Sequence, residues 1–130
     1  PNNLFVAGFI GSPAMNFIKG KVEGGAFGAF HAGGITLPLP PNRGSASDGQ
    51  AVIYGIRPEH LRLDGGGVAA TVHVTEPTGS ETQVIMDLAG TQVVGAFRER
   101  IAEKPGQHLY IAPEPALVHL FDEQTGTRLN

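Results

Sequence analysis

The sequence predicts an all-β fold whose short strands form a small closed barrel. The 130 residues include 19 glycines and 10 prolines, which divide the chain into short segments. Several segments alternate apolar and polar side chains, with the period of two that is typical of strands. Only 16% of the residues are charged, and the length suits one domain that buries about two-thirds of its unfolded surface. A closed barrel is favoured because closure leaves no free strand edges.

The first segment is the exception, because residues 1–13 predict a short N-terminal helix and a linker. An asparagine near the start can cap the helix, and Gly11 suits the position just after its end. Its apolar stripe is formed by Phe5, Phe9 and Ile10. A stripe this apolar requires a surface to dock on, so we expect the helix to pack against another part of the protein.

The next part of the chain predicts four strands, at residues 17–23, 26–32, 35–39 and 51–56. Pairs of glycines follow the first and second of these strands and indicate hairpin turns. Residues 40–50, with the sequence PPNRGSASDGQ, have no periodic apolar content and therefore predict a mobile loop.

Three consecutive glycines at 65–67 are the strongest break in the chain, and they predict a seam between two halves of the domain. Beyond them, the predicted strands are 68–75, 82–88, 91–98, 108–112 and 117–121. Ala89 and Gly90 predict a tight hairpin, and residues 104–107 predict a polar turn.

The most informative stretch runs from Ala51 to His60 and reads AVIYGIRPEH. Both faces of its strand are largely apolar, which predicts that the strand is buried. Pro58 ends the strand because it has no N–H group to donate. Arg57, Glu59 and His60 are thereby presented together at the mouth of the strand. Charged residues in such a place are typical of a structural corner or an interface, and less often of catalysis.

A second candidate surface is the loop from Glu76 to Thr82, which reads EPTGSET. Pro77 and Gly79 fix its turn geometry, and its hydroxyl groups can hydrogen-bond to the backbone. One interpretation is a rigid corner of the barrel. The other is a recognition loop, because polar groups held on a stiff scaffold are natural contact points. Its candidate contact residues are Glu76, Thr78, Gly79, Ser80 and Glu81.

The sequence excludes ATP hydrolysis by these residues. A phosphate loop needs the pattern Gly-x4-Gly-Lys-Ser/Thr, but the three lysines are followed by Gly20, Val22 and Pro105. No Leu-Ser-Gly-Gly-Gln signature is present either. We therefore assign no catalytic residues.

Metal and nucleic-acid sites are also disfavoured. The chain has no cysteine and no His-x-His pair, so its five histidines are expected to be structural or surface residues. The net charge of −3 gives no basic footprint for nucleic acid. No apolar run approaches the roughly 20 residues that cross a bilayer.

Four blocks, in order, resemble one protein family, the ATPase subunits of carbohydrate-type ABC importers for maltose, glycerol-3-phosphate and related solutes. The blocks are Phe5 to Pro13 followed by Met15-Asn16-Phe17, Gly55 to His60, Glu76 to Thr82, and Leu120-Phe121-Asp122 with Thr125-Gly126. In that family the signature at Gly55 to His60 lies in the regulatory domain, an OB-type β-barrel called the transport-associated OB (TOBE) domain. The resemblance implies that residues 1–13 are the tail helix of the ATPase domain with its linker, and that residues 14–130 are the TOBE regulatory domain.

The resemblance also implies partners and a location. It implies a homodimer with a second copy of the subunit, contact with the transporter's membrane subunits through the parent protein, and regulation by a ligand or protein. The loops at Arg57–His60 and Glu76–Thr82 are where such domains pair or receive regulators. ATP and Mg²⁺ would bind in the missing ATPase domain, and the location would be cytoplasmic, on the inner face of the membrane.

An alternative function remains open at this point. Related barrels bind oxyanions such as molybdate, so the domain could instead be a small-ligand module for an oxyanion or a sugar. Such a site needs convergent polar and cationic groups. The candidates are Lys19, Lys21, Thr78 and Ser80.

Overall fold

The computed structural model describes residues 14–25 and 28–130. The helix predicted within residues 1–13, with its stripe of Phe5, Phe9 and Ile10, lies outside the described residues.

Five strands form the first sheet, and all neighbours within it are antiparallel. The strands are β1 (Asn16–Glu23), β2 (Ala29–Ala32), β3 (Ile35–Pro38), β4 (Ala51–Ile56) and β9 (His119–Asp122), in the order β3-β2-β1-β4-β9. The buried strand predicted at residues 51–56 is confirmed with the same bounds, and five of its six residues are buried.

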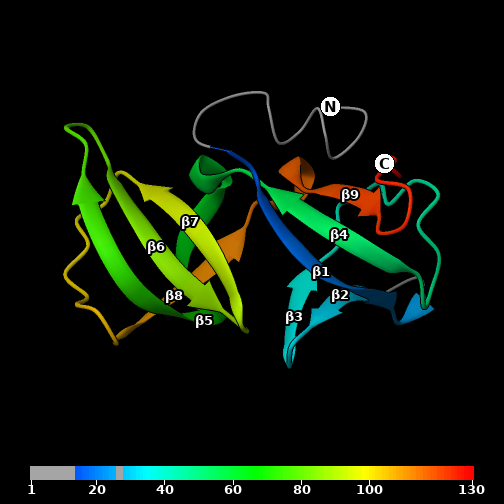
Figure 1. Ribbon diagram of the computed structural model, residues 1–130, viewed down its shortest axis with the longest axis horizontal. Helices are drawn as coiled ribbons and strands as arrows, with labels where there is room; N and C mark the ends of the chain where they lie inside the picture. The colour runs from blue at the N-terminus through cyan, green and yellow to red at the C-terminus, as the bar shows by residue number, and fades with distance from the viewer. Residues whose placement is uncertain (1–13, 26–27) are drawn as a thin grey trace.

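Four strands form the second sheet, which is also antiparallel. They are β5 (Leu61–Pro77), β6 (Thr82–Leu88), β7 (Thr91–Phe97) and β8 (His108–Pro113), in the order β7-β6-β5-β8. Short 3-10 helices, η2 (Pro58–His60) and η3 (Pro115–Leu117), lead from β4 into β5 and from β8 into β9. Figure 1 shows the two sheets side by side, with β1 of the first sheet next to β7 of the second.

The all-β prediction is confirmed, but the strands are not joined into one closed cylinder. Within the described part of the chain, hydrogen bonds divide them into two sheets, with β3, β9, β7 and β8 at the edges. The sequence pattern could not show this, because strand alternation is local whereas the division depends on which distant strands pair.

One apolar core holds the two sheets together. It includes Phe30 and Tyr54 from the first sheet, together with Met86 and Ile111 from the second. The rings of Phe30 and Tyr54 have centroids 4.7 Å apart, and the Tyr54 hydroxyl donates a hydrogen bond to the carbonyl oxygen of Pro38 at 2.7 Å. Burial raises the pKa of the Tyr54 phenol, so this group remains a neutral hydrogen-bond donor.

Residues 40–50 form no strand, as predicted, but they are anchored, which the prediction of a mobile loop missed. Arg43 donates hydrogen bonds to the carbonyl oxygens of Gly25 at 2.8 Å and Ala46 at 3.2 Å, and it pairs with Asp48 at 3.0 Å. Ala46 is buried in the core. Further hydrogen bonds join the loop to Val22, Asp122 and Leu129. These polar contacts are a signal that apolar periodicity does not contain.

The prediction of a seam at residues 65–67 is wrong, because β5 runs through this stretch. Leu63 and Val68 both pair with Ile111 of β8, so residues 64–67 bulge out between them. A methyl group at Gly67 would overlap the carbonyl oxygen of Ile111. At this position glycine therefore permits a close approach of two strands within one sheet.

Candidate functional site

The predicted corner at Arg57–His60 forms where β4 meets β5. Arg57 is extended, and Pro58 begins η2 with its side chain buried. This arrangement leaves Glu59 exposed and His60 half-buried. The Nδ1 atom of His60 is buried and has no hydrogen-bond partner among the described residues.

The predicted loop at Glu76–Thr82 is a tight turn between β5 and β6. Thr78 donates two hydrogen bonds to the carbonyl oxygen of Glu81, from its backbone N–H at 2.8 Å and from its hydroxyl at 3.0 Å. Gly79 has a φ of +92°, which only glycine adopts without strain. The turn is therefore rigid, and Glu76, Thr78, Gly79 and Ser80 are exposed on it.

The structure brings one residue from each predicted loop into a shared surface hollow of about 480 Å³. Glu59 enters it from η2 and Glu81 from the turn between β5 and β6. The other residues that line this charged hollow are Leu61, Arg62, Ala96, Phe97, Arg98 and Glu99. The remaining predicted site residues, Arg57, His60, Glu76, Thr78, Gly79 and Ser80, do not line it.

The charged hollow combines an apolar floor with a charged rim. Leu61, Ala96 and Phe97 are buried. Of the two arginines, Arg62 already pairs with Glu114, with 2.6 Å between Nη1 and Oε2. Such a rim selects partners through charge and shape, and it contains no nucleophile–base pair that would suggest a reaction.

A group of cationic residues lies near His119 on the first sheet. His119 pairs across the sheet with Gly55 of β4, and Arg57 follows Gly55 by two residues, just beyond the end of the strand. Burial and, to a lesser degree, the positive charges of Arg128, Arg57 and His60 together lower the pKa of His119 to about 4. His119 is therefore neutral at physiological pH.

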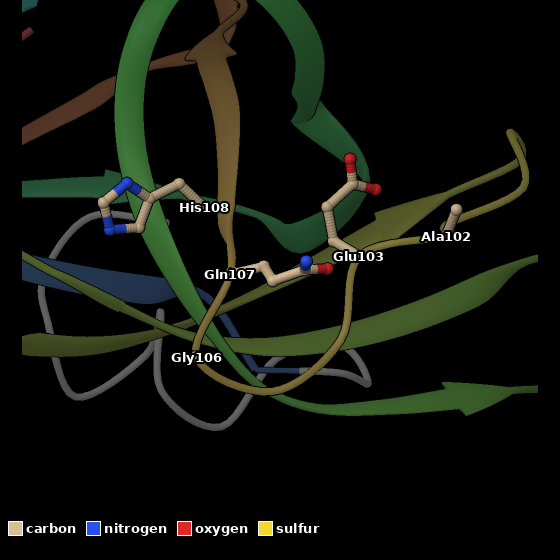
Figure 2. A pocket seen from close by; sticks show the side chains of 5 residues that line it. All are labelled: Ala102, Glu103, Gly106, Gln107 and His108. Carbon is tan, nitrogen blue, oxygen red and sulfur yellow. The ribbon is translucent and has the colours of Figure 1, made fainter.

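A second, more open hollow of about 540 Å³ lies at the connection between β7 and β8. Figure 2 shows that the His108 ring and the Glu103 carboxylate lie on opposite sides of Gln107. The Gln107 side chain is already engaged, because its Oε1 accepts a hydrogen bond from the N–H of Lys104 at 2.8 Å. In the part of the chain that the structure describes, no group of three or more His, Cys, Asp or Glu residues is placed to hold a metal ion.

The candidate oxyanion residues do not converge. Lys19 and Lys21 lie on β1 of the first sheet, whereas Thr78 and Ser80 lie at the turn between β5 and β6 of the second. Figure 1 shows this turn at the far end of the second sheet from β1. A single small anion cannot contact both groups.

The sequence did not predict several residues that line the charged hollow, nor a buried asparagine that contacts β7. Arg62, Arg98 and Glu99 are exposed charges with no local pattern that sets them apart. Asn16 is buried and bonds to Val94, 78 positions away in the sequence. Its presence in a block of the family resemblance was the available signal.

The chain matches two domain families in succession. Residues 11–61 match the MalK OB fold domain, and residues 54–121 match the TOBE domain. A crystal structure of the cytoplasmic molybdate-binding protein ModG, with molybdate bound, is similar in fold, with a TM-score of 0.62. The similarity covers 81% of this chain and 94% of that one at 22% sequence identity. These similarities confirm the OB-type fold.

Curated relatives are ATP-binding proteins of ABC transporters. The chain is 44% identical to an uncharacterized ABC transporter ATP-binding protein of Sinorhizobium fredii, over 99% of this chain and 35% of the relative. It is 38% identical to the sulfoquinovosyl glycerol transport ATP-binding protein of Agrobacterium fabrum, over 96% of this chain and 36% of the relative. It is 40% identical to an sn-glycerol-3-phosphate import ATP-binding protein of the same organism, over 99% of this chain and 35% of the relative. The chain thus spans little more than a third of the length of these relatives.

In the part of the chain that the structure describes, none of the helices meets the length and hydropathy that a membrane-spanning helix needs.

Proposed function

This chain belongs to the TOBE domain family, and from that membership we propose that it is the regulatory domain of the ATP-binding subunit of an ABC importer for sugars or related solutes. The observation that supports this most strongly is the unbroken succession of the MalK OB fold and TOBE matches over residues 11–121. In this proposal ATP and Mg²⁺ bind outside these residues, and the chain itself hydrolyses no ATP. The parent subunit lies in the cytoplasm, on the inner face of the membrane, and works with the membrane subunits.

The proposed work of the domain is mechanical. It holds two copies of the parent subunit together while their ATP-binding parts separate and rejoin. A permanent contact makes the rejoining nearly intramolecular, with an effective partner concentration of about millimolar. Three large apolar side chains that remain exposed, Val74, Tyr110 and Leu117, supply apolar surface that a second copy can cover.

The charged hollow is the proposed place for a regulator to bind. A regulator changes the balance between joined and separated subunits only by binding one state more tightly than the other. The hollow is suited to this, because its rim combines residues from η2, from the turn between β5 and β6, and from the stretch after β7. A rearrangement of any of these elements would change the site.

Sedimentation of the chain and of the longer natural protein tests the dimer. We expect self-association of the chain within the range of about 10 to 500 μM, typical of a modest interface. We also expect the longer protein to lose dimers when this domain is deleted. A strictly monomeric chain, together with a longer protein that stays dimeric after the deletion, would remove the dimerisation role.

Charge reversal in the charged hollow tests the regulatory role. The change Glu59→Lys with Glu81→Lys alters the rim by four charge units. The double change Glu103→Lys with Glu123→Lys, at residues outside this hollow, gives the same net charge and serves as the control. We expect the double variant to change the regulation of transport in the intact transporter, and the control to leave it unchanged. Equal behaviour of all three proteins would exclude the hollow as the regulator's site.

The alternative function, oxyanion binding, is not favoured, because Lys19 and Lys21 are separated from Thr78 and Ser80. Calorimetric titration of the chain with molybdate, tungstate, sulfate and phosphate is expected to give no binding heat. Saturable heat that Lys19→Gln with Lys21→Gln abolishes would restore this function.

A further inference from the structure

Asn16 is unusual in being polar and buried. Within the described residues it is the one polar or charged residue in the buried class, with 7% of its surface exposed. An amide without hydrogen-bond partners in such a place would destabilise the fold, so its contacts need an explanation.

The Asn16 side chain joins the two sheets. Its Nδ2 donates a hydrogen bond to the carbonyl oxygen of Val94 at 2.8 Å, and its Oδ1 accepts one from the N–H of Val94 at 2.8 Å. Asn16 also pairs through its backbone with Ile56 of β4. The side-chain amide therefore binds the edge strand β7 as a neighbouring strand residue would.

The chemistry of this contact requires an amide. The carboxamide of Asn presents a donor and an acceptor in one plane, which matches the N–H and C=O of a single extended residue. A leucine of similar size would bury as well but would bind neither group. Filling buried space therefore does not explain an asparagine at this position, whereas the two hydrogen bonds to Val94 do.

The contact lies beside the charged hollow. Ala96 and Phe97, which follow Val94 by two and three residues on β7, line the hollow. The lining also includes Glu59 of η2, and one residue separates η2 from the β4 strand with which Asn16 pairs. Asn16 therefore connects β7, which lines the hollow, to the strand that leads into η2, which lines it as well.

We propose that Asn16 is a positioning residue, whose amide holds β7 at a fixed distance from η2 and thereby sets the shape of the charged hollow. It binds no ligand itself. The geometric part of this inference is independent of function, whereas its consequence for regulation rests on the proposed function.

Backbone and side-chain NMR of the chain tests the geometric part without a variant. In the wild type, the Val94 amide and the Asn16 side-chain NH₂ protons are expected to exchange slowly with solvent. Asn42 is exposed, so its side-chain NH₂ protons serve as the rapidly exchanging control. Rapid exchange at Asn16, equal to that at Asn42, would overturn the inference.

Three substitutions separate positioning from packing. Asn16→Ala and Asn16→Leu both remove the amide, and we expect Val94 to exchange at least about tenfold faster in each, the equivalent of one lost hydrogen bond. The signals of Ala96, Phe97 and Glu59 should shift in both. If Asn16→Leu keeps these signals at their wild-type positions, Asn16 merely fills space.

Asn16→Asp provides a reversible version of the test. A protonated carboxyl group has one O–H donor and one carbonyl acceptor, so it can replace both hydrogen bonds, whereas a carboxylate can only accept. We expect shifted signals for Ala96 and Phe97 at pH 7 that return towards wild-type positions as the pH falls to about 4.5. The titratable groups on the packed elements are Lys19, Lys21 and Glu23 on β1, Tyr54 on β4 with Arg57 just after it, and Glu59 and His60 on η2, while β7 carries none. The pH dependence of the Ala96 and Phe97 signals in the wild type and in Asn16→Ala measures the effect of those groups. If Asn16→Asp shows the same pH dependence as these two proteins, the inference is contradicted.

The two proposals fail in different ways. If the hollow signals shift in the Asn16 variants but regulation of the intact transporter is unchanged, the proposed function of the hollow is wrong and the positioning role stands. If the hollow signals do not shift, the positioning role is wrong whatever the transporter does.

Discussion

His119 favours its neutral form in the folded protein, because burial and the nearby charges of Arg128, Arg57 and His60 lower its pKa to about 4. In the unfolded chain its pKa is the ordinary 6.5. Between these values the unfolded state binds a proton that the folded state does not. The free energy of unfolding therefore falls as the pH falls from about 6.5 to about 4.

Replacing His119 by glutamine removes this proton-linked loss while keeping a polar side chain of similar size. Between pH 6.5 and 4.5, we expect the free energy of unfolding of the wild-type chain to fall more steeply than that of His119→Gln, as measured by urea unfolding. The titration of Asp122 does not contribute to this difference, because it occurs below the pH range of the measurement. Hydrogen bonds from Thr125 and Gln50 lower the pKa of its carboxyl below 3.8, so its contribution is lost at still lower pH. Parallel stability curves for the two proteins would contradict the assignment.

The hairpin that joins β6 and β7 contains backbone strain at one residue, Ala89. Its turn residues Ala89 and Gly90 have φ angles of 51° and 87°, as a two-residue hairpin with both central residues left-handed requires. Glycine adopts this conformation freely, whereas alanine is strained in it. The prediction of a tight hairpin is confirmed, and the strain at Ala89 is its cost.

Ala89→Gly should therefore stabilise the protein by about 0.5–1 kcal/mol, because relief of the strain outweighs the greater freedom of the unfolded chain. The matched control is Ala69→Gly, at an exposed position within β5 where φ is not positive. That change should destabilise by about 0.5–1 kcal/mol. Chemical unfolding of both variants checks the opposite signs, and equal losses would show that the turn is not strained.

At the scale of the whole molecule, the shared core predicts that the two sheets unfold together. Phe30 and Tyr54 of the first sheet belong to the same buried cluster as Met86 and Ile111 of the second. Neither sheet can keep its apolar face covered without the other, so a single cooperative transition is expected.

Residue-resolved thermal unfolding by NMR measures this cooperativity. The signals of Phe30 and Met86 should disappear at one midpoint, and Met86→Ala should lower both midpoints equally. The cavity left by that change should cost about 2–5 kcal/mol. Separate midpoints for the two sheets would mean that they are independent units.

The predictions from sequence were most accurate where the signal is local. Residues 51–56 and 82–88 were expected as strands and form β4 and β6 with the same bounds, because apolar alternation and flanking turn residues define them. The charged hollow was only half predicted. Glu59 and Glu81 lie in recognisable turns, whereas Arg98 comes near them only through strand pairing. The contact between Asn16 and Val94 depends on the same long-range pairing.

The bulge in β5 has a practical consequence for altering this protein. Leu63 and Val68 are each fixed against Ile111, so residues between them can change in number without moving the strand on either side. Doubling such a loop costs only about 0.6 kcal/mol in closure entropy. A peptide tag or a fluorescent reporter spliced between Gly65 and Gly66 would thus leave the register of every strand as it is.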